Sequence, residues 1–116
     1  MTDADRYAEV IAAELVEVAA GRLEGYALDD PADAVPTWCA ELALDIEVTR
    51  SMTTGDVTAV EVARTLGGPG CWCTFRDGQD AEVVAVWGRD RAHRYVPADL
   101  VAPLTTYLHD LAEVTR

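Results

Sequence analysis

Two cysteines flank a tryptophan in the stretch Cys71-Trp72-Cys73, and these thiols are the side chains best suited to chemistry in this chain. Structural zinc sites use pairs of Cys-x-x-Cys or Cys/His knuckles, whereas this chain offers one further cysteine and two histidines at unrelated positions. Thiols outside such a pattern usually pack as small apolar side chains. Residues two apart on a strand point the same way, so we expect Cys71 and Cys73 to be buried on one face and Trp72 to lie on the other.

A nucleophilic cysteine is the second chemistry to consider, and it needs a neighbouring base and a lowered pKa. His93 is the candidate base, but no spacing in the sequence brings it to Cys71 or Cys73. The stretch GGPG at 67–70 lacks the Gly-Lys-Ser/Thr ending of a phosphate-binding loop, and it precedes a predicted strand instead of a helix. We therefore expect a protein that is not an enzyme and uses no cofactor or metal. A metal or cysteine site at Cys71, Cys73 and His93 stays open as an alternative.

The charge of the chain is strongly negative, with 21 acidic residues against nine basic ones, all arginine, and a formal net charge of −12. Binding to nucleic acid or to an anionic membrane needs clustered cations, so we expect neither. Residues 1–50 carry twelve of the acids against three arginines, which predicts a concentrated negative face for a basic partner. Solubility or a salt-loving host would explain the same composition without a binding role.

The predicted partner-binding residues are ten of the twelve acidic side chains in residues 1–50 and one acid of a following strand. Their expected role is electrostatic steering and ion pairing with Arg or Lys. A calcium site among the aspartates at 29–33 is disfavoured, because the spaced ligands and central glycine of a calcium loop are absent. The set is Asp3, Asp5, Glu9, Glu17, Glu24, Asp29, Asp30 and Asp33, together with Asp45, Glu47 and Glu61 if the first strands are exposed.

Helices are predicted at both ends of the chain. The first begins at Thr2 or Asp3 and ends by Gly21 or Gly25, and its expected apolar stripe is Tyr7, Val10, Ile11, Leu15 and Val18. The second is opened by Pro97 and Asp99, although Pro103 favours a start near Val101. Its expected apolar stripe is Leu100, Leu104, Tyr107, Leu108, Leu111 and Val114.

The middle of the chain is predicted to form a short helix at 36–41, followed by strands at 44–50, 57–66, 71–75 and 81–88. Residues 89–96 are a possible edge strand. Asp77-Gly78 is a strong hairpin signal, and GGPG supplies another sharp reversal. Strands joined by tight turns form an antiparallel meander. We therefore predict an α+β fold in one domain, residues 1–116, whose sheet of four or five strands carries the N-terminal and C-terminal helices on one face.

Two other groups of side chains have a structural and a functional interpretation. The tryptophans are expected in the core or at its rim, with at least one partly exposed as an interface anchor; they are Trp38, Trp72 and Trp87. The one basic group is expected to balance nearby acids, with an anion or partner contact as the alternative. It comprises Arg89, Arg91 and Arg94 with His93 and Tyr95.

The stretches PTWCAELALDIEV, TLGGPGCWCTF and VVAVWG, within Pro36 to Gly88, form a layout that resembles small uncharacterised proteins of phages and integrative elements. The resemblance implies a mobile-element origin and transfers no catalytic residue. A small acidic domain of this kind is similar to inhibitors that imitate nucleic acid, such as anti-CRISPR or antirestriction proteins. Its partner would be a basic surface of a host nucleic-acid enzyme.

Two further expectations concern the compartment and the alternative function. No long apolar segment is present, and the irregular cysteines suit a reducing compartment, so we expect a location in the cytoplasm of a prokaryotic host with a GC-rich genome. The alternative function is a non-enzymatic interaction or accessory domain. It would form a homodimer through a sheet edge or a tryptophan face, and its acidity would serve only solvation.

Overall fold

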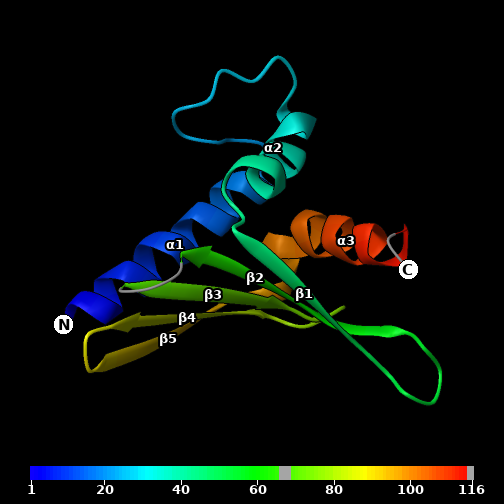
Figure 1. The fold of residues 1–116 in the computed structure, drawn as a ribbon. Helices are drawn as coiled ribbons and strands as arrows, with labels where there is room; N and C mark the ends of the chain where they lie inside the picture. Colours follow the sequence, from blue (N-terminus) through cyan, green and yellow to red (C-terminus); the bar gives the residue numbers. More distant parts are fainter. Residues whose placement is uncertain (66–68, 115–116) are drawn as a thin grey trace.

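The structure is a computed structural model that describes residues 1–65 and 69–114. Its five strands form one antiparallel sheet in the order β1-β2-β3-β4-β5, and a helix lies at each end of the chain (Figure 1). The predicted α+β meander is confirmed, and the segment at 89–96 is a full edge strand. The elements are α1 (Asp3–Ala19), η1 (Pro31–Asp33), α2 (Ala34–Glu41), β1 (Asp45–Arg50), β2 (Val57–Thr65), β3 (Gly70–Phe75), β4 (Ala81–Trp87), β5 (Asp90–Val96) and α3 (Ala98–Val114).

Both terminal helices lie on the same side of the sheet (Figure 1). Helix α1 packs on β4 and β5, α3 packs on β2, and the two helices contact each other. The strand residues that join the core alternate along each strand, as a one-sided sheet requires. They are Val60, Val62, Cys71, Cys73, Phe75, Ala81, Val83, Ala85, Ala92 and Val96. The residues between them form the opposite side of the sheet, which we call the open sheet face.

Helix α1 begins with a capping box, in which the Thr2 hydroxyl accepts from the Asp5 amide and the Asp5 carboxylate accepts from the Thr2 amide. The predicted stripe is right at Ile11, Leu15 and Val18, and Tyr7 is partly buried. It is wrong at Val10, which is 62% exposed. Val10 is about 100° around the helix from Ile11 and therefore lies off the buried stripe. That stripe instead includes the small residues Ala4 and Ala8.

Helix α3 begins at Ala98, which agrees with the predicted opening at Pro97 and Asp99 and precedes the alternative start near Val101. The Asp80 carboxylate, at the end of the β3–β4 turn, accepts a hydrogen bond from the Ala98 amide. It continues through Pro103. The missing proline amide would have bonded the carbonyl of Asp99, an exposed residue of the first turns, where that carbonyl is open to solvent. The predicted stripe is wrong at its ends, since Leu100 and Val114 are exposed. The buried residues are Val101, Leu104, Thr105, Leu108 and Ala112.

Of the two turns predicted from glycine-containing stretches, the one at Asp77-Gly78 lies where the sequence placed it. Gly78 has a positive φ of 70°, and the Gln79 amide donates to the Arg76 carbonyl, which closes the β3–β4 hairpin at the predicted Asp77-Gly78. Gly67 and Gly68, half of the predicted GGPG reversal, lie outside the described residues. Helix α2 starts two residues earlier than predicted, because Pro36 falls in its first turn, where a proline is tolerated.

The three tryptophans occupy three environments. Trp38 of α2 is fully buried, Trp72 of β3 is half-buried, and Trp87 of β4 is 41% exposed with its ring edge-on to Tyr7. The prediction that at least one tryptophan is partly exposed is confirmed. Among the described residues, no helix has the length and apolar character needed to cross a membrane.

Candidate functional site

The thiols of β3 occupy the core, as predicted. Cys71 and Cys73 are fully buried on the helix-covered side of the sheet. Cys73 lies opposite Val83 of β4, whereas His93 of β5 lies opposite Val84, one residue further along. A step of one residue on a strand reverses the side, so His93 projects from the open sheet face. The register therefore separates the candidate base from both thiols.

The two thiols of β3 differ in their environment. The hydrogen bond with Cys73 lowers the pKa of Cys71 despite its burial. The hydrogen bond with Cys71 and burial together raise the pKa of Cys73 well above its ordinary value. Burial raises the pKa of Cys39 to about 11. Within residues 1–65 and 69–114, no three Cys, His, Asp or Glu side chains come together in a way that would hold a metal ion.

The predicted acidic residues are divided between two sides of the sheet. Four lie on α1 and four in the segment between α1 and α2, on the helix-covered side or beyond it. Asp45, Glu47 and Glu61 alternate with Ile46, Val60 and Val62, which pack on the core, so their side chains project from the open sheet face. The acids of the first half thus do not form the single face that their distribution in the sequence led us to expect.

Three acids of the helix side have structural roles. Asp5 caps α1 and lies 3.5 Å from the Arg94 guanidinium of β5. The Thr2 amide, then the Thr2 hydroxyl, and to a smaller extent Arg94 lower the pKa of Asp5. Glu17 pairs with Arg22, which lowers the pKa of Glu17, and Asp30 accepts from the Ala32 amide at the start of η1. These three carboxylates therefore already interact with groups of the molecule itself.

A row of polar side chains crosses the open sheet face from β1 to β5. Its members face each other pairwise through the strand register, and they are Glu47, Glu61, Thr74, Glu82 and Tyr95. Neighbouring strands are about 4.8 Å apart, so Glu47 and Glu61 are direct neighbours. Glu82 was not among the predicted binding residues, although alternation with Val83 in β4 would have placed it on this side.

An apolar centre lies beside this row. Trp72 is half-buried on the central strand and faces Ala63 of β2 and Val84 of β4, which are only 5% and 9% exposed. This surface combines a tryptophan, small apolar neighbours and adjacent acidic side chains. Protein interfaces have a similar composition, with aromatic side chains as anchors at their centre.

The carboxylates of the open sheet face differ in their partners. Glu82 accepts a hydrogen bond from the Tyr95 hydroxyl and lies 3.6 Å from His93. Asp45, Glu47 and Glu61 have no ion-pair partner in the part of the chain that the structure describes. We call these three residues the β1–β2 acidic patch.

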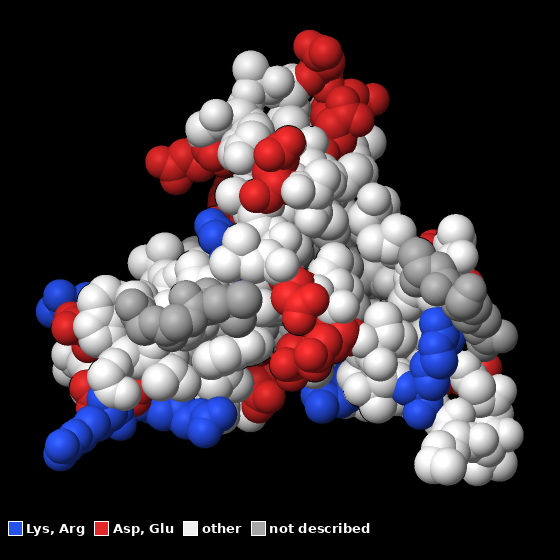
Figure 2. Space-filling model, viewed as in Figure 1, with Lys and Arg blue, Asp and Glu red and all other residues white. Residues whose placement is uncertain are grey.

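Charge is unevenly distributed over the surface, although basic side chains also lie beside the acids in the middle of Figure 2. Figure 2 shows acidic side chains gathered around the segment that leads to α2 and again in the middle of the view, and basic side chains near the β4–β5 turn at the lower left. Within the basic group, Arg94 pairs with Asp5 and His93 lies near Glu82, so these two balance nearby acids as predicted. Arg89 and Arg91 are exposed.

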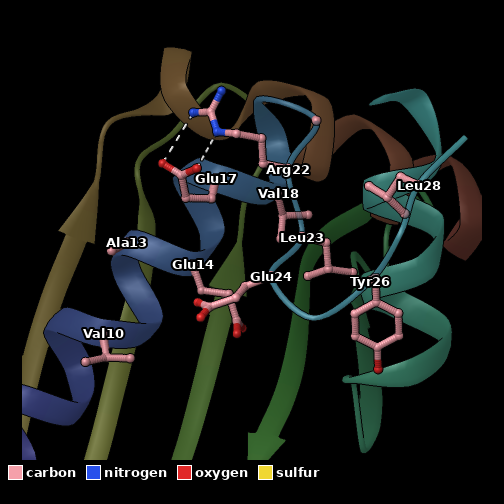
Figure 3. Close-up of a pocket in the computed structure, with 11 residues that line it drawn as sticks. Val10, Ala13, Glu14, Glu17, Val18, Arg22, Leu23, Glu24, Tyr26 and Leu28 are labelled. Carbon is pink, nitrogen blue, oxygen red and sulfur yellow. Dashed lines mark hydrogen bonds and ion pairs between the residues drawn. The ribbon is translucent and has the colours of Figure 1, made fainter. Parts of the chain in front are cut away.

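A groove of about 780 Å³ lies between the second half of α1 and the segment at 21–28 (Figure 3). Its walls are mainly apolar, and Glu14, Glu17 and Glu24 line it together with Arg22. Glu17 and Glu24 are among the predicted binding residues, but the groove itself was not predicted. The groove depends on how an irregular segment folds back along a helix, which has no periodic signal.

Comparison with known proteins found no matching family model, no matching curated protein and no matching solved structure. Inference about function therefore starts from the two surfaces of this molecule, the open sheet face and the groove.

Proposed function

We propose that this chain is a small acidic binding protein of the mobile-element type, which imitates the charge of nucleic acid and blocks a host nucleic-acid enzyme. The observation that carries the proposal is the β1–β2 acidic patch beside Trp72. Its three carboxylates are exposed on a helix-free face and form no ion pair in the described part of the chain. A groove built for phosphates binds closely spaced negative charge of this kind.

The pairing of Glu47 with Glu61 supports a binding role. Like charges directly opposite each other on neighbouring strands destabilise a sheet. A cation or a neutral side chain at either position would remove that repulsion. The repulsion is relieved when a basic partner supplies the missing cations, so the patch favours the bound state.

Trp72 supplies the apolar part of the proposed interface. Charged groups at an interface mainly increase the association rate and select the partner, whereas a large aromatic anchor contributes much of the binding energy. The half-buried indole lies next to the acidic row, so one partner surface covers both. The target class is a restriction or CRISPR effector, whose nucleic-acid groove is basic.

The alternative is an accessory domain or homodimer that uses the same face without mimicry. The apolar centre of Trp72, Ala63 and Val84 favours it, since such a contact needs no basic partner. Binding through this centre would tolerate salt, whereas binding through the acidic patch weakens as salt screens the charges.

The test is a pull-down from a GC-rich bacterial lysate with the tagged chain, at low and high salt, with and without excess duplex DNA. The patch variant carries Asp45→Asn, Glu47→Gln and Glu61→Gln. The matched control removes the same charge outside the predicted binding set with Glu41→Gln, Asp56→Asn and Asp110→Asn, which are all exposed. We expect the wild type to capture a nucleic-acid enzyme at low salt, DNA to displace it, and only the patch variant to lose it.

Two results would contradict the proposal. Capture that ignores both salt and DNA would favour the accessory-domain alternative, and equal loss in both triple variants would show that only total charge matters. We expect the patch variant to stay folded, because removing the Glu47–Glu61 repulsion should stabilise the sheet by about 0.2–1 kcal/mol. Loss of the captured enzyme would then reflect loss of binding. Chemical denaturation of the patch variant checks that point.

A further inference from the structure

The groove beside α1 is a second surface, and it does not depend on the proposed function. It lies on the helix-covered side of the sheet, away from the open sheet face. We infer that it binds a short amphipathic segment of a partner protein, with large apolar side chains seated in the groove and a Lys or Arg held at its acidic rim.

Exposed apolar side chains line the groove on both sides. Val10 of α1 is 62% exposed and Tyr26 of the following segment is 39% exposed, while Leu23 and Val18 beneath them are buried (Figure 3). Val10 breaks the amphipathic pattern of α1, because it lies on the solvent side of a helix whose core stripe is elsewhere. An occupant of the groove would cover Val10 and Tyr26 together.

The acids of the rim select the charge of the occupant. Glu14 is already held by Arg64, and Glu17 by Arg22. Glu24 is exposed and has no ion-pair partner among the described residues, and Figure 3 shows it directed into the groove together with Glu14. The surplus negative charge favours a cationic group and disfavours a nucleic acid or an acidic peptide.

The dimensions favour a peptide segment over a small cation. Val10 and Val18 are eight residues apart on α1, which corresponds to about 12 Å along the helix. Several side chains are needed to fill a groove of that length, as in the binding of an amphipathic helix. A second copy of this chain is disfavoured, since its net charge of −12 would add carboxylates to an acidic rim.

The test uses a fluorescein-labelled 18-residue peptide of Leu, Lys and Ala with an amphipathic helical pattern, and a scrambled peptide of the same composition. Binding is measured by fluorescence anisotropy at physiological salt. The groove variant is Val10→Ser with Tyr26→Ser. The matched control is Val114→Ser with Tyr95→Ser, which changes the same residue types at more exposed positions outside the groove. Each variant is checked by thermal unfolding.

We expect the patterned peptide to bind the wild type at least tenfold more tightly than the scrambled peptide. The groove variant should lose at least tenfold in affinity, Glu24→Gln should lose several-fold, and the control should match the wild type. The patch variant of the open sheet face should also match the wild type, so failure of the proposed function and failure of this inference are separable.

Three outcomes would overturn the inference. Equal binding of patterned and scrambled peptides would mean attraction by net charge alone. Undiminished binding by the groove variant would place the peptide elsewhere. Concentration-dependent dimerisation of the wild type that the groove variant lacks would show that a second copy is the occupant.

Discussion

Glu14 joins three elements through one carboxylate. It accepts two hydrogen bonds from the Arg64 guanidinium of β2, at 2.7 and 3.0 Å, and one from the Trp38 indole of α2 at 2.9 Å. Bidentate pairing of this kind is among the stronger polar interactions in proteins. Glu14 and Arg64 are each only about a fifth exposed, so water competes weakly for both. At the scale of single residues, this carboxylate holds α1 and α2 to the sheet.

Replacing Glu14 tests that role. Glu14→Gln keeps an acceptor for Trp38 but leaves the Arg64 charge without its counter-ion, so we expect a loss of about 1–3 kcal/mol in the free energy of unfolding. Glu9→Gln, an exposed change on the same helix, should alter stability by less than about 0.5 kcal/mol. Urea denaturation measures both. Equal losses in the free energy of unfolding for the two variants would show that Glu14 does not hold the helices to the sheet.

At the scale of elements, the C-terminal end of α3 depends on the β1–β2 hairpin. Its last turn contains no basic residue of its own. Arg50 of β1 donates to the Ala112 carbonyl at 2.6 Å and to the Gly55 carbonyl at 3.3 Å, and it lies 3.8 Å from Glu113. A cation at this end of a helix offsets the partial negative charge of the last carbonyls. One side chain thus couples the hairpin to the helix.

Removing the side chain should uncouple the two elements. We expect Arg50→Ala to lower stability by about 1–2 kcal/mol and to speed hydrogen exchange in the last turn of α3 and at the hairpin turn. Arg22→Ala, which breaks a surface pair with Glu17, should change stability by less than about 1 kcal/mol. Exchange that is faster throughout the sheet, and not at these ends, would argue against a local coupling.

At the scale of the whole molecule, negative charge exceeds positive charge by twelve. Among the described residues five ion pairs form, one of which involves a histidine, so most carboxylates there take part in no ion pair. Self-repulsion of this kind destabilises a compact state. The same excess would drive the proposed steering toward a basic partner, so stability and partner binding should depend on salt in opposite directions.

A salt series tests the balance. Raising NaCl from about 10 mM to about 1 M shortens the Debye length from about 30 Å to about 3 Å, and at pH 7 we expect the Tm to rise as repulsion is screened. Near pH 4.3, where the net charge is close to zero, the rise should be much smaller. A Tm that falls with salt at pH 7 would show that the ion pairs outweigh the repulsion.

The sequence by itself determined the elements whose signals are local. Alternation along β3 placed Cys71 and Cys73 together and Trp72 opposite them, because successive side chains on a strand point to opposite sides. Asp77-Gly78 located the β3–β4 hairpin, because glycine adopts a positive φ without strain. The meander then followed, since short turns between strands leave little choice of topology.

The tertiary structure alone decided which residues share a surface. Helical periodicity predicts that one stripe of α1 is buried, but only packing on the sheet decided that Ala8 is buried and Val10 is exposed. The link between Glu14 and Arg64 joins residues 50 positions apart, and the groove depends on the path of an irregular segment. The division of the acids between the two sides of the sheet likewise came from the docking of α1. In each case the cause is contact between segments distant in sequence, which no local pattern encodes.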